Sequence, residues 1–142
     1  MKIVSTLSLL FLSVIMFSQT IVSTEIENKN VILEEFTGIH CGYCPDGHAI
    51  AQGILDNHRN DAFVINIHTG GYATPSGAEP DFRTEFGSSI AGQSGLTGYP
   101  SGTVNRHVFS GSSTAMGRSS WVNASNQILA QQSYVNVGQE FG

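Results

Sequence analysis

Two cysteines separated by two residues are the part of this chain best suited to chemistry. The motif Cys41-Gly42-Tyr43-Cys44 contains both cysteines of the 142-residue sequence. A Cys-x-x-Cys pair can form a disulfide, pass through a mixed disulfide with another protein, or hold a metal ion. The choice among these depends on the elements that hold the pair.

A buried strand precedes the motif and a helix follows it. Residues 31–37, Val-Ile-Leu-Glu-Glu-Phe-Thr, are β-branched and apolar at their start, which is typical of a strand buried on both faces. Apolar residues then recur at helical spacing as far as Asn57, and residues 62–68 form a second run of the buried type. Strand, helix and strand predict one parallel, right-handed βαβ unit. The motif therefore lies at the carboxyl end of a central strand.

This placement makes Cys41 the expected nucleophile. At a helix N-terminus, the unpaired amides and the positive end of the helix dipole favour the thiolate and lower the pKa of the thiol. Cys44 would face inward, less exposed, and would resolve the mixed disulfide after Cys41 attacks a substrate sulfur. Pro45 lacks an N–H and is expected to distort the first turn, which would leave the amides of residues 42–44 facing the sulfur.

Two other interpretations of the cysteine pair stay open. An inert disulfide would close a very small loop and remove little entropy from the unfolded chain, so it would stabilise the fold weakly. A zinc or copper site could add His48, which is four residues beyond Cys44 and can share a helix face with it. An attached haem is excluded because Pro45, not a histidine, follows Cys44.

Three further elements are expected after the βαβ unit. Residues 81–91 form a helix between Pro80 and Gly92, and residues 103–109 alternate as a strand does. A closing helix carries an apolar face from Trp121 to Leu129. The apolar face of this closing helix consists of Trp121, Ala124, Ile128 and Leu129. The apolar face of the helix over residues 81–91 consists of Phe82, Phe86 and Ile90.

The two ends of the chain differ in composition from its middle. Residues 1–18 read as a signal peptide, because Lys2 precedes an apolar run that is shorter than a membrane span, and residues 19–29 read as a flexible lead-in. One domain is expected over residues 30–132. Residues 133–142 would begin a further strand that stops without a turn signal, as in a fragment of a longer protein. A net charge of -5 excludes the basic surface that nucleic-acid binding requires.

Two segments resemble known proteins. Residues 35–45, Glu-Phe-Thr-Gly-Ile-His-Cys-Gly-Tyr-Cys-Pro, resemble the active-site strand and turn of the thioredoxin-like superfamily. More narrowly, these residues and residues 98–106, Gly-Tyr-Pro-Ser-Gly-Thr-Val-Asn-Arg, are similar to the Omp-twenty-eight-related outer-membrane proteins of Bacteroidetes. The resemblance implies an α/β thioredoxin-like fold: a central mixed β-sheet flanked by helices in three layers, α/β/α.

The resemblance also implies roles for individual residues. Pro100 would be cis and stand opposite the disulfide, where the backbone of Tyr99 would offer hydrogen bonds to an extended substrate strand. Glu35 would be a buried acid with a raised pKa that takes the proton from Cys44. Glu34 is the alternative candidate for this base. Two departures count against an efficient reductase: His40 replaces the usual tryptophan, and Gly42-Tyr43 replaces Gly-Pro.

The expected function is an exported thiol-disulfide oxidoreductase with Cys41, Cys44 and Glu35 as catalytic residues. Gly42, Tyr43, Tyr99 and Pro100 would bind protein thiols or disulfides, and no cofactor or metal would be needed. The periplasm, the outer membrane or the exterior would be its location. The alternatives are an outer-membrane-associated or secreted binding or structural protein with the same scaffold, and a metal carrier that uses the cysteine pair and a histidine.

Overall fold

The computed structural model describes residues 22–138, and these belong to two units. The larger, Glu27–Ser133, contains all the helices and strands described below. In the smaller, Asn136 donates hydrogen bonds to the carbonyl oxygens of Ser23 and Glu25. The predicted signal peptide, residues 1–18, lies outside the described residues. Over residues 22–138, none of the helices has the length and apolar character that a membrane span requires.

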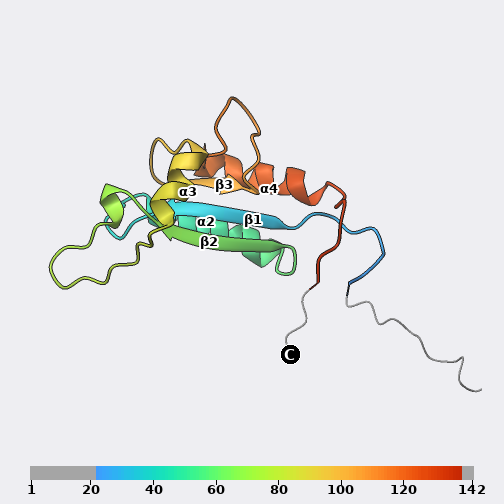
Figure 1. Cartoon of the computed structure of the whole chain (residues 1–142), viewed down its shortest axis with the longest axis horizontal. Helices are drawn as coiled ribbons and strands as arrows, with labels where there is room; N and C mark the ends of the chain where they lie inside the picture. The colour runs from blue at the N-terminus through green and yellow to red at the C-terminus, as the bar shows by residue number, and fades with distance from the viewer. Residues whose placement is uncertain (1–21, 139–142) are drawn as a thin grey trace, which may run out of the picture. The chain divides into compact units, whose positions relative to one another are not determined.

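A four-stranded sheet forms the centre of the larger unit, in the order β2-β1-β3-β4. Strand β1 (Val31–Thr37) pairs in parallel with β2 (Ala62–His68) along its whole length. On its other side it pairs antiparallel with β3 (Ser101–Val104), which in turn pairs with the short β4 (Met116–Gly117). The sheet is therefore mixed, and β1 is a central strand, as the sequence predicts (Figure 1).

Helices cover both faces of this sheet. Helices α2 (Cys44–Asn57) and α4 (Trp121–Leu129) lie on one face, while α3 (Gly87–Ser94) lies on the other (Figure 1). Two short 3-10 helices, η1 (Gly71–Ala73) and η2 (Arg118–Ser120), lie in the connections. The main core joins the sheet to α2 and α4, and its buried members are Val31, Leu33, Ala51, Ile54, Ala62, Val104, Trp121, Ala124 and Ile128. These three layers confirm the predicted thioredoxin-like α/β fold.

The alternation of side chains along β1 sends neighbouring residues to opposite faces. Val31 and Leu33 pack in the core beneath α2 and α4, whereas Phe36 packs with Ala91 of α3. Glu34 and Glu35, adjacent in the sequence, consequently point to different layers. Glu35 shares the face of α2, and Glu34 shares the face of α3.

The predicted helix over residues 81–91 is wrong in its first half, because α3 begins at Gly87 and continues to Ser94. Asp81 and Arg83 form a local turn instead: the Asp81 carboxylate accepts hydrogen bonds from both the backbone amide and the guanidinium of Arg83. Such side-chain-to-backbone bonds compete with the helix. Phe82 and Phe86, whose spacing suggested a buried helix face, are largely exposed.

Strand β3 is shorter than the predicted strand over residues 103–109. It ends at Val104 because Asn105 and Arg106 both have positive φ angles, 50° and 48°, which turn the chain out of the sheet. Asn105 fixes this turn, since its side chain accepts a hydrogen bond from the amide of Ile32 and donates one to the carbonyl of Asn30. The strand expected to begin at residue 133 is also absent from the described part of that segment, residues 133–138.

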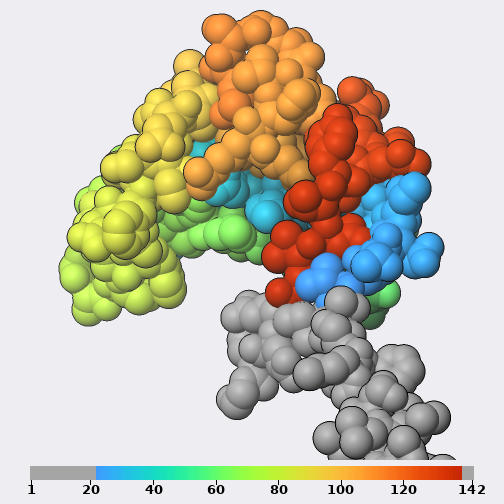
Figure 2. Space-filling view, turned by 45° about the vertical axis from the view of Figure 1, so that its right-hand side comes forward, coloured from blue at the N-terminus to red at the C-terminus, as the bar shows by residue number. Residues whose placement is uncertain are grey.

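Strand β2 is an edge strand of the described sheet and is not buried on both faces as predicted. Phe63 and Ile65 are 50% and 49% exposed, and Ile32 beside them on β1 is 44% exposed. Helix α3 has eight residues and covers only the end of the strands that leads to the cysteine motif. The uncovered sheet is visible as the floor of a hollow beside the yellow segment in Figure 2.

Glu34 is held in a polar network on the α3 face. Its carboxylate accepts hydrogen bonds from the Arg106 guanidinium, with 2.8 Å between Nε and Oε2, and from the Thr103 hydroxyl at 2.9 Å. The hydrogen bond from Arg106 is the main reason that the pKa of Glu34 lies below its usual range; burial opposes it, and Thr103 assists. Both oxygens of Glu34 are engaged, because Oε1 accepts a second bond from Arg106.

We predict that Arg106→Gln lowers the free energy of unfolding by about 1–2 kcal/mol, at the low end for a charged bond because the Arg106 side chain is half exposed. The ion pair stabilises the fold fully above the unfolded-state pKa of Glu34, and this stabilisation is lost as the pH falls through the lowered folded-state pKa. Urea denaturation should therefore show that the difference in unfolding free energy between wild type and Arg106→Gln is smaller at about pH 3 than at about pH 7.

The control for this prediction is Arg59→Gln, which removes an exposed i,i+3 pair with Asp56 and should change stability by less than about 0.5 kcal/mol. An equal loss of stability for Arg106→Gln at both pH values would contradict the role assigned to the Glu34 ion pair.

Candidate active site

Cys41 and Cys44 form a disulfide, with an S–S distance of 2.01 Å. Cys41 lies in the turn after β1, where its amide donates a hydrogen bond to the carbonyl of Gly38, and Cys44 is the first residue of α2. Cys41 is 7% exposed and Cys44 only 1%. Cys41 is therefore the sulfur that a partner can reach first, and Cys44 lies beneath it.

The loop after β2 holds the cysteine turn in place. The amide of His40 donates a hydrogen bond to the carbonyl of Tyr72 at 2.9 Å. Gly38 packs so tightly on the same residue that a Cβ added there would lie 2.4 Å from the backbone carbon of Tyr72. The His40 ring also pairs with Glu79, 2.9 Å away. His40 therefore acts as a link between the turn and this loop.

The first turn of α2 supplies fewer amides to a sulfur anion than the sequence suggests. The amide of Cys44 already donates to the carbonyl of Cys41 at 3.2 Å, which leaves the amides of Gly42 and Tyr43 as candidates. Pro45 falls within this first turn, where a missing N–H is tolerated. Its expected distorting effect is not needed to explain the turn.

The Tyr99-Pro100 peptide bond is cis, as the resemblance implies. Pro100 lies against the first turn of α2, because a Cβ added at Gly47 would lie 3.1 Å from the Pro100 Cβ. Burial raises the pKa of the Tyr99 hydroxyl, while a hydrogen bond with Thr69 opposes this change. Tyr99 also contacts Tyr72 edge to face, with 5.6 Å between ring centroids.

A cationic side chain lies beside the exposed Tyr43 within the motif. The ring of Tyr43 is 72% exposed, and the guanidinium of Arg118 lies 5.9 Å from its centroid. Arg118 pairs in turn with Asp46 of α2. An aromatic ring and a neighbouring cation therefore flank the disulfide on the solvent side.

Glu35 is completely buried beneath α2. Its Oε2 is 3.0 Å from Nδ1 of His48, while Oε1 has no hydrogen-bond partner among the described residues. Oε1 lies under Gly47, since a Cβ added there would be only 2.7 Å from it. Burial raises the pKa of Glu35, and the positive charge and hydrogen bond of His48 partly offset this rise.

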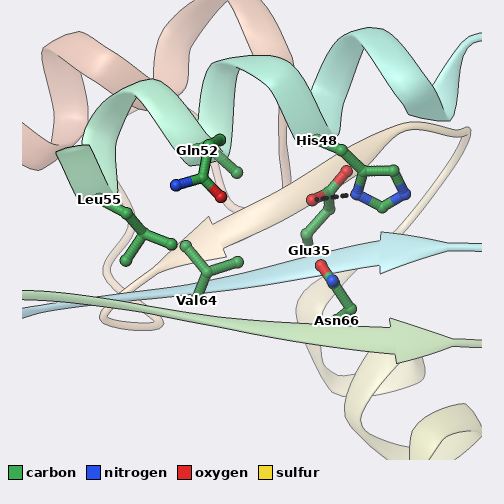
Figure 3. Close-up of a pocket in the computed structure, with 7 residues that line it drawn as sticks. Glu35, His48, Gln52, Leu55, Val64 and Asn66 are labelled. Carbon is green, nitrogen blue, oxygen red and sulfur yellow. Dashed lines mark hydrogen bonds and ion pairs between the residues drawn. The ribbon is translucent and has the colours of Figure 1, made fainter.

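A cavity beside Glu35 is lined by residues of α2, β1 and β2. Its volume is about 260 Å³. Figure 3 shows Glu35 and His48 at one end of it, joined by a hydrogen bond, with Gln52 of α2 and Asn66 of β2 nearby. The lining residues are Glu35, His48, Ala51, Gln52, Leu55, Val64 and Asn66. The carboxylate thus borders a space with polar walls.

The structure brings several of the predicted site residues to one place. Glu35 and Pro100 both lie against Gly47, three residues beyond Cys44 on the same helix. His48, considered as a metal ligand from the sequence, instead contacts Glu35 and Thr37. Across residues 22–138, no group of three or more His, Cys, Asp or Glu side chains is arranged to hold a metal ion.

Two features of the site were missed from the sequence. Gly47 lies in the first turn of α2, and a glycine inside a helix, where it is unfavourable, was a signal that another group approaches the backbone closely. The hydrogen bond between His48 and Glu35 was harder to predict from the sequence, because the prediction required knowing which face of β1 packs against α2.

Two of the solved structures that match this chain are bacterial proteins. The X-ray structure of protein AGR_C_4864 from Agrobacterium tumefaciens matches with a TM-score of 0.52 and 14% identity, over 72% of this chain and 45% of that one. HBP35 of Porphyromonas gingivalis matches with a TM-score of 0.47 and 24% identity, over 72% of this chain and 32% of that one. This chain thus spans less than half the length of either structure.

The comparisons extend no further than the fold. No family model and no curated protein matched the sequence. At the low identity of the Agrobacterium protein, the likeness concerns the arrangement of strands and helices alone. The narrower resemblance to the Omp-twenty-eight-related proteins stays a prediction.

We predict that Gly47→Ala destabilises the protein by about 1–3 kcal/mol, although alanine is the better helix former. The new methyl group would press on both the Glu35 carboxylate and Pro100. The matched control is Gly53→Ala in the same helix, where nothing lies within 4 Å of the added Cβ and a gain of about 0.5–1 kcal/mol is expected. Urea denaturation measures both, and a gain for Gly47→Ala would refute the close approach of Glu35.

Proposed function

We propose that this chain is a thiol-disulfide oxidoreductase that acts on the cysteines of other proteins. The observation that carries the proposal is the placement of the disulfide at the end of the central strand β1. Cys41 there is the more exposed of the two cysteines, and Cys44 begins the helix under which a carboxylate is buried. A bridge that only stabilised the fold would need no such carboxylate.

Reduction of a substrate would proceed in two exchanges. The Cys41 thiolate attacks a substrate disulfide, so a new Cys41–substrate bond forms and the other substrate sulfur leaves as a thiolate. Cys44 then loses its proton to a base and attacks the Cys41 sulfur. The mixed disulfide breaks, the second substrate thiolate leaves, and the Cys41–Cys44 disulfide forms. Two electrons pass from the protein dithiol to the substrate, and the reverse sequence oxidises a substrate dithiol.

Glu35 is the base that the geometry favours over Glu34. Glu34 lies on the opposite face of β1, with both oxygens engaged by Arg106 and its pKa lowered. Glu35 lies beneath the helix turn that begins at Cys44 and retains one unpartnered oxygen. Because burial raises its pKa, Glu35 is also the stronger base of the two.

Substrate would bind as an extended segment across the disulfide. In this proposal the backbone of Tyr99, before cis-Pro100, offers hydrogen bonds to the segment. Gly42 adds no side chain that would obstruct approach to the sulfur, and the largely exposed Tyr43 provides an apolar contact next to it. Protein thiols and disulfides are thus the proposed partners.

The proposed setting is outside the cytoplasm, in the periplasm, at the outer membrane or beyond it. Disulfides persist in these compartments. The proposal rests on the apolar segment of residues 1–18 and on the presence of only two cysteines, both in the exchange motif.

A binding or structural scaffold is the second candidate function. It is favoured by the uncovered apolar sheet face formed by Ile32, Phe63 and Ile65, each about half exposed. The metal-carrier alternative gains no such support, since His48 of the proposed ligand set is engaged by Glu35 and Thr37.

We expect Cys44→Ser to accumulate mixed disulfides through Cys41, because the second exchange cannot occur. Cys41→Ser should form far fewer, since Cys44 is almost fully buried. Non-reducing electrophoresis after incubation of the reduced variants with unfolded proteins that carry disulfides measures the adducts. Wild type should also reduce insulin in the presence of dithiothreitol.

Absence of adducts in Cys44→Ser together with absence of insulin reduction by the wild type would refute the oxidoreductase and leave the scaffold. A reduction potential for the Cys41–Cys44 couple separates the cases independently: an inert bridge is expected below about -300 mV.

A further inference from the structure

We propose that Glu35 and His48 act as one proton-exchanging pair, in which His48 connects the buried carboxylate to solvent and sets the pH range over which Cys44 attacks. The inference rests on the proposed function and names a residue for which sequence reasoning gave only a metal-binding role. His48 does not touch the reacting sulfurs in this scheme. It is a positioning residue that acts through Glu35.

The first support is the difference in exposure within the pair. The Glu35 side chain is fully buried, whereas the side chain of His48, hydrogen-bonded to it at 3.0 Å, is 41% exposed. A proton on the carboxylate therefore has one protein group between it and bulk water. Imidazole suits this position because its ordinary pKa lies close to neutral pH.

The second support is the hydroxyl group on the other side of the ring. Thr37 Oγ1 is 3.3 Å from Nε2 of His48. When the ring is neutral with its proton on Nδ1, the hydroxyl donates to Nε2; when the ring is protonated, both nitrogens donate and the hydroxyl accepts. The histidine can thus gain or lose a proton without losing either hydrogen bond.

The third support is the difference in surroundings between the two carboxylate oxygens of Glu35. Oε2 faces His48, while the unpartnered Oε1 lies under Gly47 in the turn that begins at Cys44. A buried polar atom without a partner is costly, so its retention calls for an explanation. As the oxygen that receives the Cys44 proton, Oε1 must be free before the reaction.

The cavity offers a parallel path for protons to the same pair. Its volume of about 260 Å³ is ample for water, and the side chains of Gln52 and Asn66 supply polar walls (Figure 3). The proton from the Cys44 thiol would pass to Glu35 Oε1 as the sulfur attacks Cys41. It then leaves from Oε1 to a water molecule, or from Oε2 to Nδ1 of the His48 tautomer that carries its proton on Nε2 and donates it to Thr37. No electron moves in this step.

Few other charges bear on the pair. His68, at the end of β2, lies within electrostatic reach of His48, and burial followed by this repulsion lowers the pKa of His68. On α2 itself, Cys44 is a titratable group, and the Asp46 carboxylate is paired with Arg118. Pro100 beside Gly47 carries no charge. The Glu35–His48 attraction is consequently the main electrostatic influence on the carboxylate after burial.

The test follows the second exchange directly in the full-length protein. Reduced wild type is mixed with the aromatic disulfide dithiobis(nitrobenzoate), which releases one coloured thiolate when Cys41 attacks and a second when Cys44 resolves the adduct. Cys44→Ser identifies the first phase, because it stops there. The rate of the second phase is then recorded against pH for wild type and the variants.

His48→Gln keeps a hydrogen-bond donor but removes the titrating charge, so Glu35 ionises less readily. We expect the second phase to be about tenfold slower at about pH 6 and within about twofold of wild type at about pH 9, where the thiol ionises without a base. His48→Lys restores the positive charge and should recover most of the rate at about pH 6. The matched control is His58→Gln, at the other end of the same helix, with a wild-type profile.

A double-mutant cycle shows whether His48 acts through Glu35. Glu35→Gln alone should slow the second phase, and adding His48→Gln should change it by less than about twofold. A further slowing equal to that of the single His48 variant would overturn the inference, as would a His48→Gln profile that superimposes on wild type. Failure of wild type to release a second thiolate would instead refute the proposed function.

A spectroscopic titration keeps the inference testable if a variant does not fold. In oxidised wild type, carbon-13 NMR of the Glu35 carboxyl and proton NMR of the His48 ring should show shared inflections, since two groups that interact strongly titrate as a pair. Independent single-step titrations of the two groups would overturn the pairing.

Discussion

The site depends on the burial of two adjacent carboxylates in the central strand. Glu34 and Glu35 are 6% and 0% exposed, and a carboxylate removed from water is costly unless it is paired or hydrogen-bonded. Because consecutive strand residues point to opposite faces, one pairing partner cannot serve both. Each face of the sheet must supply its own: Arg106 on the side of α3 and His48 on the side of α2.

The accommodation of Glu35 explains much of the local structure around the disulfide. The carboxylate fits under α2 because Gly47 lacks a side chain, and the same gap admits Pro100 from the segment before β3. His48, the next residue of the helix, then reaches the carboxylate from its solvent side. Strand β1, helix α2 and the cis-proline segment are thus fitted together at one point, three residues beyond Cys44.

The elements that hold the site could be predicted from sequence because their signals are local. Strand β1 at Val31–Thr37 and helix α4 at Trp121–Leu129 have the predicted bounds, since β1 is an almost continuous buried run and the buried residues of α4 recur at helical spacing. Helix α3 could not be placed this way: Phe82 and Phe86 have helical spacing but are exposed, and the Asp81–Arg83 turn determines the conformation there. The resemblance named Glu35 rather than Glu34, but the pairing that separates them was beyond the sequence, because Arg106 lies 72 residues from Glu34.

The two carboxylates have opposite consequences for stability. The folded-state pKa of Glu34 is lowered, so its ion pair adds stability above the pKa of an unfolded glutamate and loses it in acid. The folded-state pKa of Glu35 is raised, so its contribution is favourable below the unfolded pKa and is lost as the pH rises through the folded pKa. A neutral side chain at position 35 would avoid that loss near neutral pH. In the proposed function, an ionisable group at position 35 serves as the proton acceptor for Cys44, and the unpartnered Oε1 lies beneath the helix turn that Cys44 begins.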